Sequence, residues 1–341
     1  MGSKSEKSGP NAIGQILQVA MGYMPAVCLY AAAKFKIADL LAGGSKCVSD
    51  LAEASGTNED ALYRSLRALA SLGIFKEVAP LRFENTPLSA ALRAGVPGSA
   101  RDAVLWIANP MHCRIFADFA HCVESGGTAI EHVTGRTAFE YLQDHAEDAH
   151  AFNNAMTNLS SLFSPPVLDA YDFAEAGTLA DIAGGHGFFL AAILKKYPRL
   201  RGVLFEMPYL YQAAKENIES LGLAERCDIV AGDFFKEVVR ADSYVMKCVI
   251  HDWSDDQAVA ILKNCAKAMR GNGKVILVEL VVTEGDEQSM GKWIDLEMLA
   301  MAGGRERSEA EFRDLFARAG LKLERVAPTA GPYSVLEAVK L

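Results

Sequence analysis

The sequence has no excess of positive charge. Its 341 residues include 34 lysines and arginines against 43 aspartates and glutamates, which gives a formal net charge of −9. An acidic protein is repelled by polyanions such as nucleic acid and by anionic lipid surfaces. We therefore expect neither nucleic acid nor a membrane among its partners, and a small, neutral or cationic ligand instead.

The sequence also lacks the usual signatures of a metal site. Its seven cysteines form no C-x-x-C motif, and its Cys and His residues do not have the spacing of a zinc site. The cysteines lie in apolar stretches that predict helices or strands, so we interpret them as reduced, buried thiols. This pattern favours a cytoplasmic protein and predicts no bound metal.

One stretch, residues 9–33, lacks charge over a length that could cross a bilayer. It contains Asn11, Gln15, Gln18 and Pro25, which favour a packed helix over a membrane span. With 50% hydrophobic residues the chain can fill more than one core, so two domains are the default for its length.

The N-terminal part, residues 1–100, has the pattern of a winged helix. Helical stretches at 48–56 and 58–72 are followed by short extended runs at 74–78 and 81–84. A helix–turn–helix followed by a hairpin is therefore expected.

The second helix of such a module would be its DNA reader. Here that helix begins with Asn58, Glu59 and Asp60 and has only Arg64 and Arg67 as cations, so its leading end repels phosphate. We predict a structural, dimer-forming domain and a homodimer.

The pattern of apolar residues differs between the two remaining parts of the chain. Residues 101–165 show helical periodicity and predict a helical connector, which the proline pair at 165 and 166 is expected to end. Over residues 166–341, short apolar runs alternate with helical stretches, which predicts an α/β domain with a doubly wound parallel sheet. The apolar runs lie at 178–182, 202–205, 228–230, 243–250 and 274–282, and a hairpin-like pair follows at 321–326 and 334–339.

A glycine-rich loop at residues 181–187 follows the first of these strands. Glycines there let the backbone turn sharply and approach a nucleotide-like ligand. Dinucleotide enzymes have a G-x-G-x-x-G motif at this place, but Leu190 occupies the position of its third small residue, which disfavours NAD. A plain glycine turn does not explain Asp181, which lies inside an otherwise apolar strand.

Carboxylates follow the next two strands. Glu206 ends the second strand, where it could accept both hydrogen bonds of a ribose diol or be a solvated charge. Asp233 follows the third strand and precedes Phe234, a pairing of polar edge and apolar face that suits adenine. Three acidic side chains at three successive strand ends indicate a nucleotide-like ligand.

His251 follows the fourth strand, just before a helix that starts with a capping box of Ser254 and Gln257. Histidine suits a general base because its ordinary pKa lies near neutrality. Glu279 interrupts the apolar fifth strand, and a buried carboxylate needs a partner or a task. It could hold the imidazole in one tautomer, or it could pair with a buried lysine or arginine.

These segments resemble the plant-type O-methyltransferase family, which includes caffeic acid and acetylserotonin O-methyltransferases and bacterial natural-product tailoring enzymes. The motifs that carry the resemblance follow the family's order along nearly the whole chain: D-I-A-G-G-H-G (181–187), F-E-M-P (205–208), G-D-F-F (232–235), M-K-C-V-I-H-D-W-S-D (246–255) and G-G-R-E-R-S (303–308). The resemblance implies a class I methyltransferase domain with a Rossmann-like sheet, behind a winged-helix dimerisation domain. It also implies S-adenosylmethionine (SAM) as methyl donor, S-adenosylhomocysteine as product and a small aromatic acceptor, most simply a phenol.

The resemblance further implies a role for individual residues. Contacts to SAM are implied for Asp181, Gly184, Gly185, Gly187, Glu206, Asp233, Phe234 and Lys247. Catalytic roles are implied for His251 as the base, with Glu279 and Glu306 flanking it, and acceptor contacts for Phe152, Met156, Asp252 and Met298. The connector would thus contribute to the acceptor pocket.

Three positions depart from the family's pattern. Ala183 stands where the loop usually has another glycine, and Glu206 where this subfamily usually has aspartate; both changes keep the chemistry. Ala302 lies near the place of an asparagine that touches substrate in plant members, so the acceptor is left open. N-methylation or another SAM-dependent tailoring reaction is the alternative, and a ligand-sensing winged-helix regulator is a more distant one.

Overall fold

The structure, a computed structural model, describes residues 12–96 and 98–341. The chain divides into two compact units, of which the first reaches Cys113 and the second begins at Arg114. The division into 1–100, 101–165 and 166–341 expected from the sequence remains a prediction.

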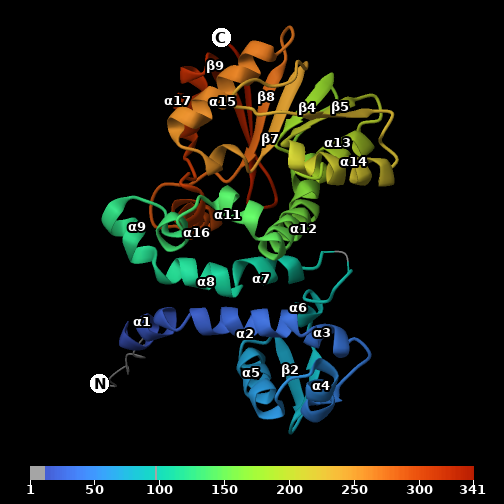
Figure 1. Cartoon of the computed structure of the whole chain (residues 1–341), viewed down its shortest axis with the longest axis vertical. Helices are drawn as coiled ribbons and strands as arrows, with labels where there is room; N and C mark the ends of the chain where they lie inside the picture. The colour runs from blue at the N-terminus through green and yellow to red at the C-terminus, as the bar shows by residue number, and fades with distance from the viewer. Residues whose placement is uncertain (1–11, 97) are drawn as a thin grey trace, which may run out of the picture. The chain divides into compact units, whose positions relative to one another are not determined.

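The first unit contains the predicted helix–turn–helix and hairpin (Figure 1). Its helices are α1 (Ala12–Ala20), α2 (Tyr23–Lys34), α3 (Ile37–Leu40), α4 (Val48–Ser55), α5 (Glu59–Ser71), α6 (Pro87–Ala90) and α7 (Arg101–Ile107), and α8 (Pro110–Ala117) crosses into the second unit. The strands β1 (Lys46–Cys47), β2 (Phe75–Ala79) and β3 (Arg82–Asn85) form an antiparallel sheet in the order β1-β3-β2. The winged-helix order is therefore confirmed.

Local sequence explains where α4 and α5 end and begin. Gly56 closes α4 in the left-handed region, with a φ of 66°. Asn58 caps α5 by accepting a hydrogen bond from the Ala61 N–H at 3.0 Å. Leu66 and Phe83 are fully buried, so the helices and the hairpin share one core.

The uncharged N-terminal stretch forms two helices, α1 and α2, which meet at Met21 and Gly22. By length and composition alone, Ala12–Lys34 could cross a membrane. Residues 9–11 of the stretch lie outside the described residues. Among the described residues of this stretch, Ala32 and Ala33 of α2 are buried, Cys28 and Leu29 are partly buried against the same core, and α1 buries no residue.

The second unit is built on a seven-stranded sheet in the order β6-β5-β4-β7-β8-β10-β9. The first five strands in this order are parallel, and β10 is antiparallel to both of its neighbours. The strands are β4 (Thr178–Ile182), β5 (Arg201–Glu206), β6 (Cys227–Ala231), β7 (Ser243–Lys247), β8 (Lys274–Glu279), β9 (Leu321–Pro328) and β10 (Ser334–Lys340). This is the doubly wound sheet with a terminal hairpin that the sequence predicts.

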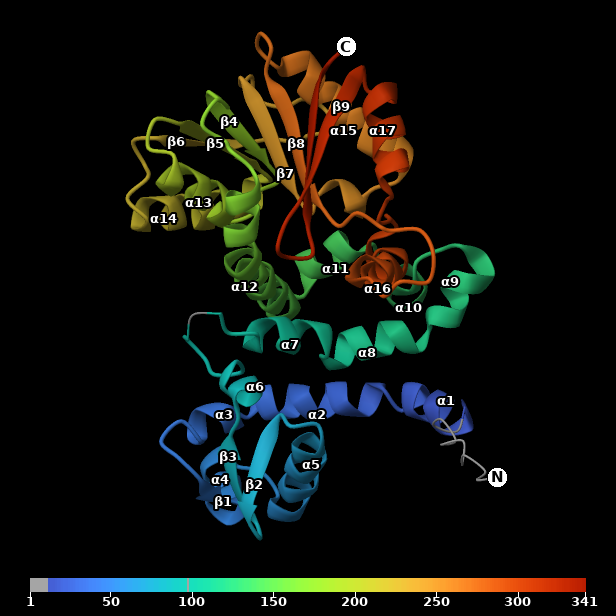
Figure 2. The ribbon, with the colours of Figure 1, turned by 180° about the vertical axis from the view of Figure 1, so that it is seen from behind.

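Helices cover both faces of this sheet. Figure 2 shows α13 (Phe188–Lys196) and α14 (Tyr211–Ser220) on one side, and α15 (Asp255–Ala268) and α17 (Glu309–Arg318) on the other. Successive residues of a strand serve opposite cores, as when Leu204 packs with α13 and Phe205 with α15. The remaining helical segments are α9 (Phe119–Ser125), α10 (Ala129–Thr134), α11 (Ala138–Asp144), α12 (Ala146–Ala170), η1 (Pro208–Leu210), η2 (Ile250–Asp252), α16 (Met290–Glu297) and the π-helix η3 (Met298–Ala302).

The proline pair does not end the connector helix as expected. α12 continues through Pro165 and Pro166 to Ala170. Proline removes a backbone N–H but tolerates the helical φ, and tertiary packing of the fully buried Val167 holds the last turns in place. The boundary expected at 165/166 therefore lies inside a continuous helix.

Candidate active site

The carboxyl ends of the parallel strands bring the predicted cofactor residues to one edge of the sheet. Asp181 lies in β4, Glu206 ends β5, Asp233 follows β6 by two residues and Lys247 ends β7. These strands are neighbours in the sheet, and open α/β sheets bind their ligands at this edge.

The glycine loop makes a tight turn against β4. Ala183, Gly185 and Gly187 all have positive φ, so the alanine that replaces a family glycine adopts a left-handed conformation of 56°. A Cβ on Gly184 would lie 2.4 Å from Oδ2 of Asp181, so the backbone can pass over this carboxylate only without a side chain.

Glu206 fastens the loop to the end of β5. Its Oε2 accepts a hydrogen bond from the Gly185 N–H and its Oε1 accepts one from the Met207 N–H, both at 2.7 Å. Burial of the carboxylate raises its pKa, and the two hydrogen bonds from backbone N–H groups partly oppose this effect. The alternative of a solvated strand-end charge does not describe this side chain.

Asp181 is a buried carboxylate whose Oδ2 has no hydrogen-bond partner among the described residues. Burial raises its pKa to about 7, and the charge of Glu206 adds to this effect while Lys247 opposes it. A buried oxygen that lacks a donor and faces the glycine loop is suited to receive one from a ligand.

Aromatic rings gather beside Asp233. Phe234 and Phe235 both meet the ring of Trp253 edge to face, with centroids 5.7 and 4.8 Å away. Phe139 of α11 stacks on the same indole at 5.8 Å. Trp253 and Phe139 have no role in the sequence analysis, although the position of Trp253 two residues after His251 was a signal for it.

His251 lies in the short helix η2, and its imidazole is held from one side. Its Nδ1 is 2.6 Å from Oε1 of Glu306, a hydrogen bond between residues that are 55 positions apart. Its Nε2 lies 3.6 Å from Oδ1 of Asp252. In the neutral form of the imidazole, with Nδ1 donating to the carboxylate, Nε2 carries the free lone pair.

Glu279 acts mainly on the backbone of the turn. Its Oε1 accepts the N–H groups of Val249 and Ile250 at 3.1 and 2.9 Å, and its Oε2 lies 3.8 Å from Nδ1 of His251. The imidazole is thus its charged neighbour, and no ion pair of Glu279 with a lysine or arginine occurs among the described residues. Glu306, rather than Glu279, makes the direct hydrogen bond to the imidazole.

The carboxylates set the protonation of the site. Burial disfavours a charged imidazole, but the charges of Glu279, Asp252 and Glu306 outweigh it and raise the pKa of His251 well above its ordinary value. Burial also disfavours a charged carboxylate, and it raises the pKa of Glu279 to about 7.

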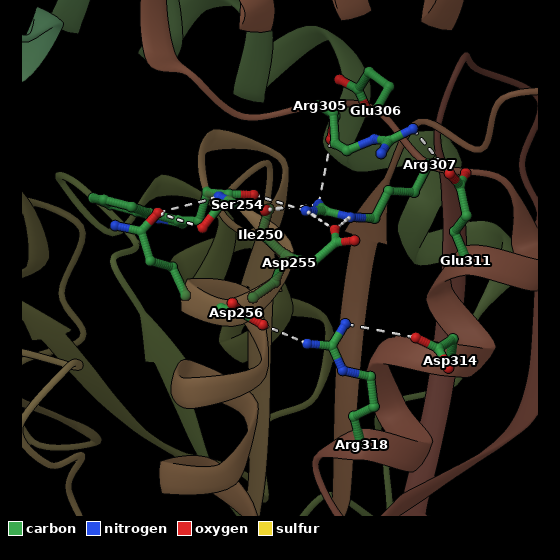
Figure 3. A network of polar contacts seen from close by, with 12 residues as sticks. Ile250, Ser254, Asp255, Asp256, Arg305, Glu306, Arg307, Glu311, Asp314 and Arg318 are labelled. Atoms are coloured by element: carbon green, nitrogen blue, oxygen red, sulfur yellow. Dashed lines mark hydrogen bonds and ion pairs between the residues drawn. The ribbon is translucent and has the colours of Figure 1, made fainter.

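Arg307 fixes the turn that carries His251, as Figure 3 shows. Its fully buried guanidinium donates to the carbonyls of Ile250 and Trp253 at 3.1 and 2.7 Å, and to Oδ1 of Asp255 at 2.9 and 3.0 Å. From the sequence, Arg307 is recognisable only as part of the motif at 303–308, and no role is predicted for it.

Gly304 and Arg305 bring this segment against the turn. The Arg305 N–H donates to the His251 carbonyl at 2.8 Å, and a Cβ on Gly304 would lie 2.0 Å from the same oxygen. Asp295 of α16 accepts the Glu306 N–H at 2.8 Å, which aims the Glu306 side chain. Residues 303–307, which we call the clamp, thus set the position of His251.

The predicted acceptor residues lie on helical segments. Phe152 and Met156 are half-buried one turn apart on α12, so they share one face of that helix. Met298 is buried at the start of η3, and π-helical segments are frequent at functional sites. Asp252, another predicted acceptor residue, lies beside the imidazole of His251, with its Oδ1 3.6 Å from Nε2.

The chain matches two family descriptions in its own order. Residues 17–95 match the O-methyltransferase dimerisation domain, and residues 116–322 match the O-methyltransferase domain.

Named relatives cover almost the whole chain. The phenazine O-methyltransferase PhzM of Lysobacter antibioticus is 43% identical over 324 residues, which are 95% of each protein. The 8-amino-8-demethylriboflavin N,N-dimethyltransferase of Streptomyces davaonensis is 33% identical over 96% of this chain and 95% of its own.

Among solved structures, an O-methyltransferase (NcsB1) from neocarzinostatin biosynthesis, in complex with SAM and 2-hydroxy-5-methyl naphthoic acid, is 30% identical and superposes with a TM-score of 0.80. The match covers 93% of this chain and 96% of that one. The fold, the site at the sheet edge and these relatives agree, and the chain belongs to the plant-type O-methyltransferase family of SAM-dependent methyltransferases.

Proposed function

We propose that the protein transfers the methyl group of SAM to a hydroxyl of a small aromatic acceptor, with His251 as the general base. The observation that carries the proposal is the 2.6 Å contact between Nδ1 of His251 and Glu306, which leaves Nε2 as the proton acceptor. Relatives that act on phenazine and naphthoate compounds support an aromatic acceptor.

In the proposed reaction the acceptor oxygen attacks the methyl carbon in line with the carbon–sulfur bond. The hydroxyl proton passes to Nε2 of His251, the new oxygen–carbon bond forms, and the carbon–sulfur bond breaks to give the neutral thioether of S-adenosylhomocysteine. Glu306 and Glu279 stabilise the imidazolium that results. Aligning the three reacting atoms away from water supplies much of the rate.

The protonation of the free site favours imidazolium, so the base needs help to become neutral. SAM is a sulfonium cation, and a positive charge bound near the imidazole lowers its pKa. Binding of SAM would therefore favour the neutral imidazole that can accept a proton. The carboxylates would then stabilise the imidazolium that forms when the proton of the acceptor is transferred.

We further propose that SAM is held by the eight residues for which the family resemblance implies contacts to it: Asp181, Gly184, Gly185, Gly187, Glu206, Asp233, Phe234 and Lys247. The unpartnered Oδ2 of Asp181, the backbone that passes it at Gly184 and the Glu206 carboxylate at the end of β5 fit a ligand with amino and hydroxyl donors. The rings around Trp253 fit its adenine. Phe152, Met156, Asp252 and Met298 remain our proposal for the acceptor side.

N-methylation is the second candidate, because the relative from Streptomyces davaonensis is named as an N,N-dimethyltransferase. A neutral amine can attack SAM before it loses its proton, so a base matters less for that reaction. The dependence of turnover on His251 therefore separates the two candidates.

The decisive experiment incubates the protein with labelled SAM and a panel of phenols, hydroxyphenazines, hydroxynaphthoates and their amino analogues. We expect methyl transfer to hydroxyl acceptors, and a loss of about 10²- to 10⁴-fold in kcat for His251→Ala. His132→Ala, a change of an exposed histidine on α10, should leave turnover unchanged. Full turnover of the His251→Ala variant would overturn the base assignment, and products methylated on nitrogen alone would favour the second candidate.

We also propose a homodimer in the cytoplasm. The match to the dimerisation domain and the exposed apolar side chains of α1 support a second copy as partner. All seven cysteines are free thiols, which supports a reducing compartment.

A further inference from the structure

A thiol and a carboxylate lie close to the imidazole of His251, the proposed base. Donor atoms of Cys248, His251 and Glu279 all lie within 4.8 Å of one another. Sulfur, nitrogen and oxygen are the donors that Zn²⁺ takes in proteins, with bonds of about 2.0–2.3 Å to each of them, so small side-chain movements would draw the three groups around one ion.

The backbone fixes all three groups before any ion binds. Cys248 has a left-handed φ of 54°, which ends β7 and turns the chain into η2. Glu279 is held at its Oε1 by two N–H groups, and its fully buried Oε2 has no hydrogen-bond partner among the residues described here. This second oxygen faces Nδ1 of His251 at 3.8 Å.

A second buried oxygen strengthens the attraction for a cation. Oε2 of Glu306 also lacks a hydrogen-bond partner within the described parts of the chain, while its Oε1 bonds the same imidazole nitrogen. Two buried carboxylates around one imidazole leave negative charge that a divalent cation would neutralise.

We propose that Cys248, His251 and Glu279 form an inhibitory site for Zn²⁺, with Glu306 in reach as a fourth ligand. The ion takes Sγ of Cys248, Nδ1 of His251 and Oε2 of Glu279, and binding releases the protons of the thiol and of Nδ1 to solvent. The imidazolium of the free site thereby becomes a neutral imidazole, bonded to the ion through Nδ1 and with its one remaining proton on Nε2. That nitrogen becomes a donor and can no longer accept the proton of the acceptor hydroxyl.

The inhibition rests on the base role proposed above, whereas binding of the ion does not. The test therefore measures binding without SAM or acceptor. Co²⁺ replaces Zn²⁺ in such sites and shows a thiolate-to-metal charge-transfer absorption that reports a cysteine ligand.

The variants must separate this cluster from other metal-binding groups. The imidazoles of the half-buried His121 and the exposed His132 stack with ring centroids 3.9 Å apart, and Asp118 lies beside His132, so His132→Ala removes a competing site. Cys227→Ser changes a buried thiol on β6 and is the matched control for Cys248→Ser. Circular dichroism checks that each variant is folded.

We expect the charge-transfer band in the wild type, Cys227→Ser and His132→Ala, and its loss in Cys248→Ser. Zn²⁺ should inhibit the wild type reversibly, with recovery on chelation. The concentration for half-inhibition, measured against each variant's own metal-free rate, should rise about tenfold or more in Cys248→Ser, since even outer-shell changes cost 10- to 100-fold in affinity.

A band that persists in folded Cys248→Ser, or no band in the wild type, would overturn the site. A Cys248-dependent band without inhibition by Zn²⁺ would overturn the inhibitory role. A Cys248-dependent band together with full turnover of His251→Ala would overturn the base proposal while supporting the metal site, so the two failures are distinguishable.

Discussion

At the scale of single residues, the site is dominated by acids that have been taken out of water. Asp181, Glu279 and Glu306 are all buried, and each has one oxygen without a hydrogen-bond partner in the described structure. Such groups are costly in the free protein and gain most from a ligand that brings charge or donors. Two predictions concern individual members of this set.

The first prediction tests the hydrogen bond between Glu306 and His251. Glu306→Gln keeps an acceptor for Nδ1–H but removes the charge that raises the pKa of the imidazole. Because the base acts in its neutral form, a lower pKa moves the acidic limb of the kcat profile to lower pH, and kcat falls because the imidazolium is less stabilised. Glu309→Gln, which breaks only an exposed ion pair with Arg313, should leave the profile in place. An unshifted limb in Glu306→Gln would contradict the assignment.

The second prediction concerns stability and Asp181. Its pKa is about 7 in the folded protein and near 3.8 in the unfolded chain, so between these values the folded state binds more protons. Stability without SAM therefore decreases as pH rises through this window, by an amount on the order of 4 kcal/mol. Asp181→Asn should flatten this trend, measured as the midpoint of thermal unfolding from about pH 4 to pH 8. An equally steep decline in the variant would show that another group is responsible.

At the scale of elements, the clamp and the turn of η2 form one unit made from distant parts of the chain. Gly304 permits the close approach, Arg305 and Arg307 bond the backbone of the turn, and Glu306 between them reaches the imidazole. Any change in the path of the clamp would therefore displace the imidazole of His251. Two predictions follow for its members.

Gly304→Ala should damage catalysis more than folding. The added Cβ would lie only 2.0 Å from the His251 carbonyl oxygen, so the clamp or the turn must shift by about 1 Å to reach an ordinary van der Waals contact. A misplacement of about 1 Å can cost about 10²-fold in rate, so we expect a loss of 10- to 100-fold in kcat. Gly271→Asn, at a left-handed position with open space around it, is the control. Wild-type kcat in Gly304→Ala would show that the close approach does not matter.

Arg307→Lys should destabilise the second unit. A lysine cannot replace the guanidinium fork, which leaves the buried carbonyls of Ile250 and Trp253 short of donors, at a cost of about 2–4 kcal/mol. Arg318→Lys changes a partly exposed arginine that pairs with Asp256 and Asp314 in the same network, and should cost less than about 1 kcal/mol. Chemical denaturation of both variants measures the difference, and equal losses would refute the clamp's role in stability.

The alternation of strands and helices was enough to predict the sheet and to bring Asp181, Glu206 and His251 to one edge. It could not predict that Glu306 rather than Glu279 makes the direct bond to the imidazole, because this depends on the path of the clamp after a π-helix. Arg307 was missed since a buried arginine looks like any other charge in a sequence. The strand expected at 243–250 stops at Lys247 because Cys248 turns left-handed, a conformation that residue type alone does not indicate.

At the scale of the whole molecule, the first unit leaves an apolar helix exposed. The large apolar side chains of α1 are more than half exposed within one chain: Ile13, Ile16, Leu17 and Val19. Exposed apolar surface of this kind marks an interaction site or is a liability for aggregation. The match to a dimerisation domain makes a second copy the expected cover.

Leu17→Glu should therefore weaken the dimer. Burying a carboxylate in an apolar interface is costly, so light scattering after size-exclusion chromatography should show a shift toward the mass of a single chain. Val123→Glu, a similar change at an exposed position of α9, should leave the mass unchanged. A Leu17→Glu variant that remains fully dimeric would place the interface elsewhere.

The continuous course of α12 also has a consequence for motion. Without N–H groups at Pro165 and Pro166, the hydrogen-bond ladder of the helix is interrupted between its first sixteen or so residues and its packed end at Val167. Segments on either side of such a gap can open independently, since cooperative units of local unfolding end where few bonds cross. Amide exchange around Phe152 and Met156 should accordingly be faster than in the strands of the sheet, so the helix that we propose for the acceptor side can open locally while the proposed cofactor residues of the sheet stay in place.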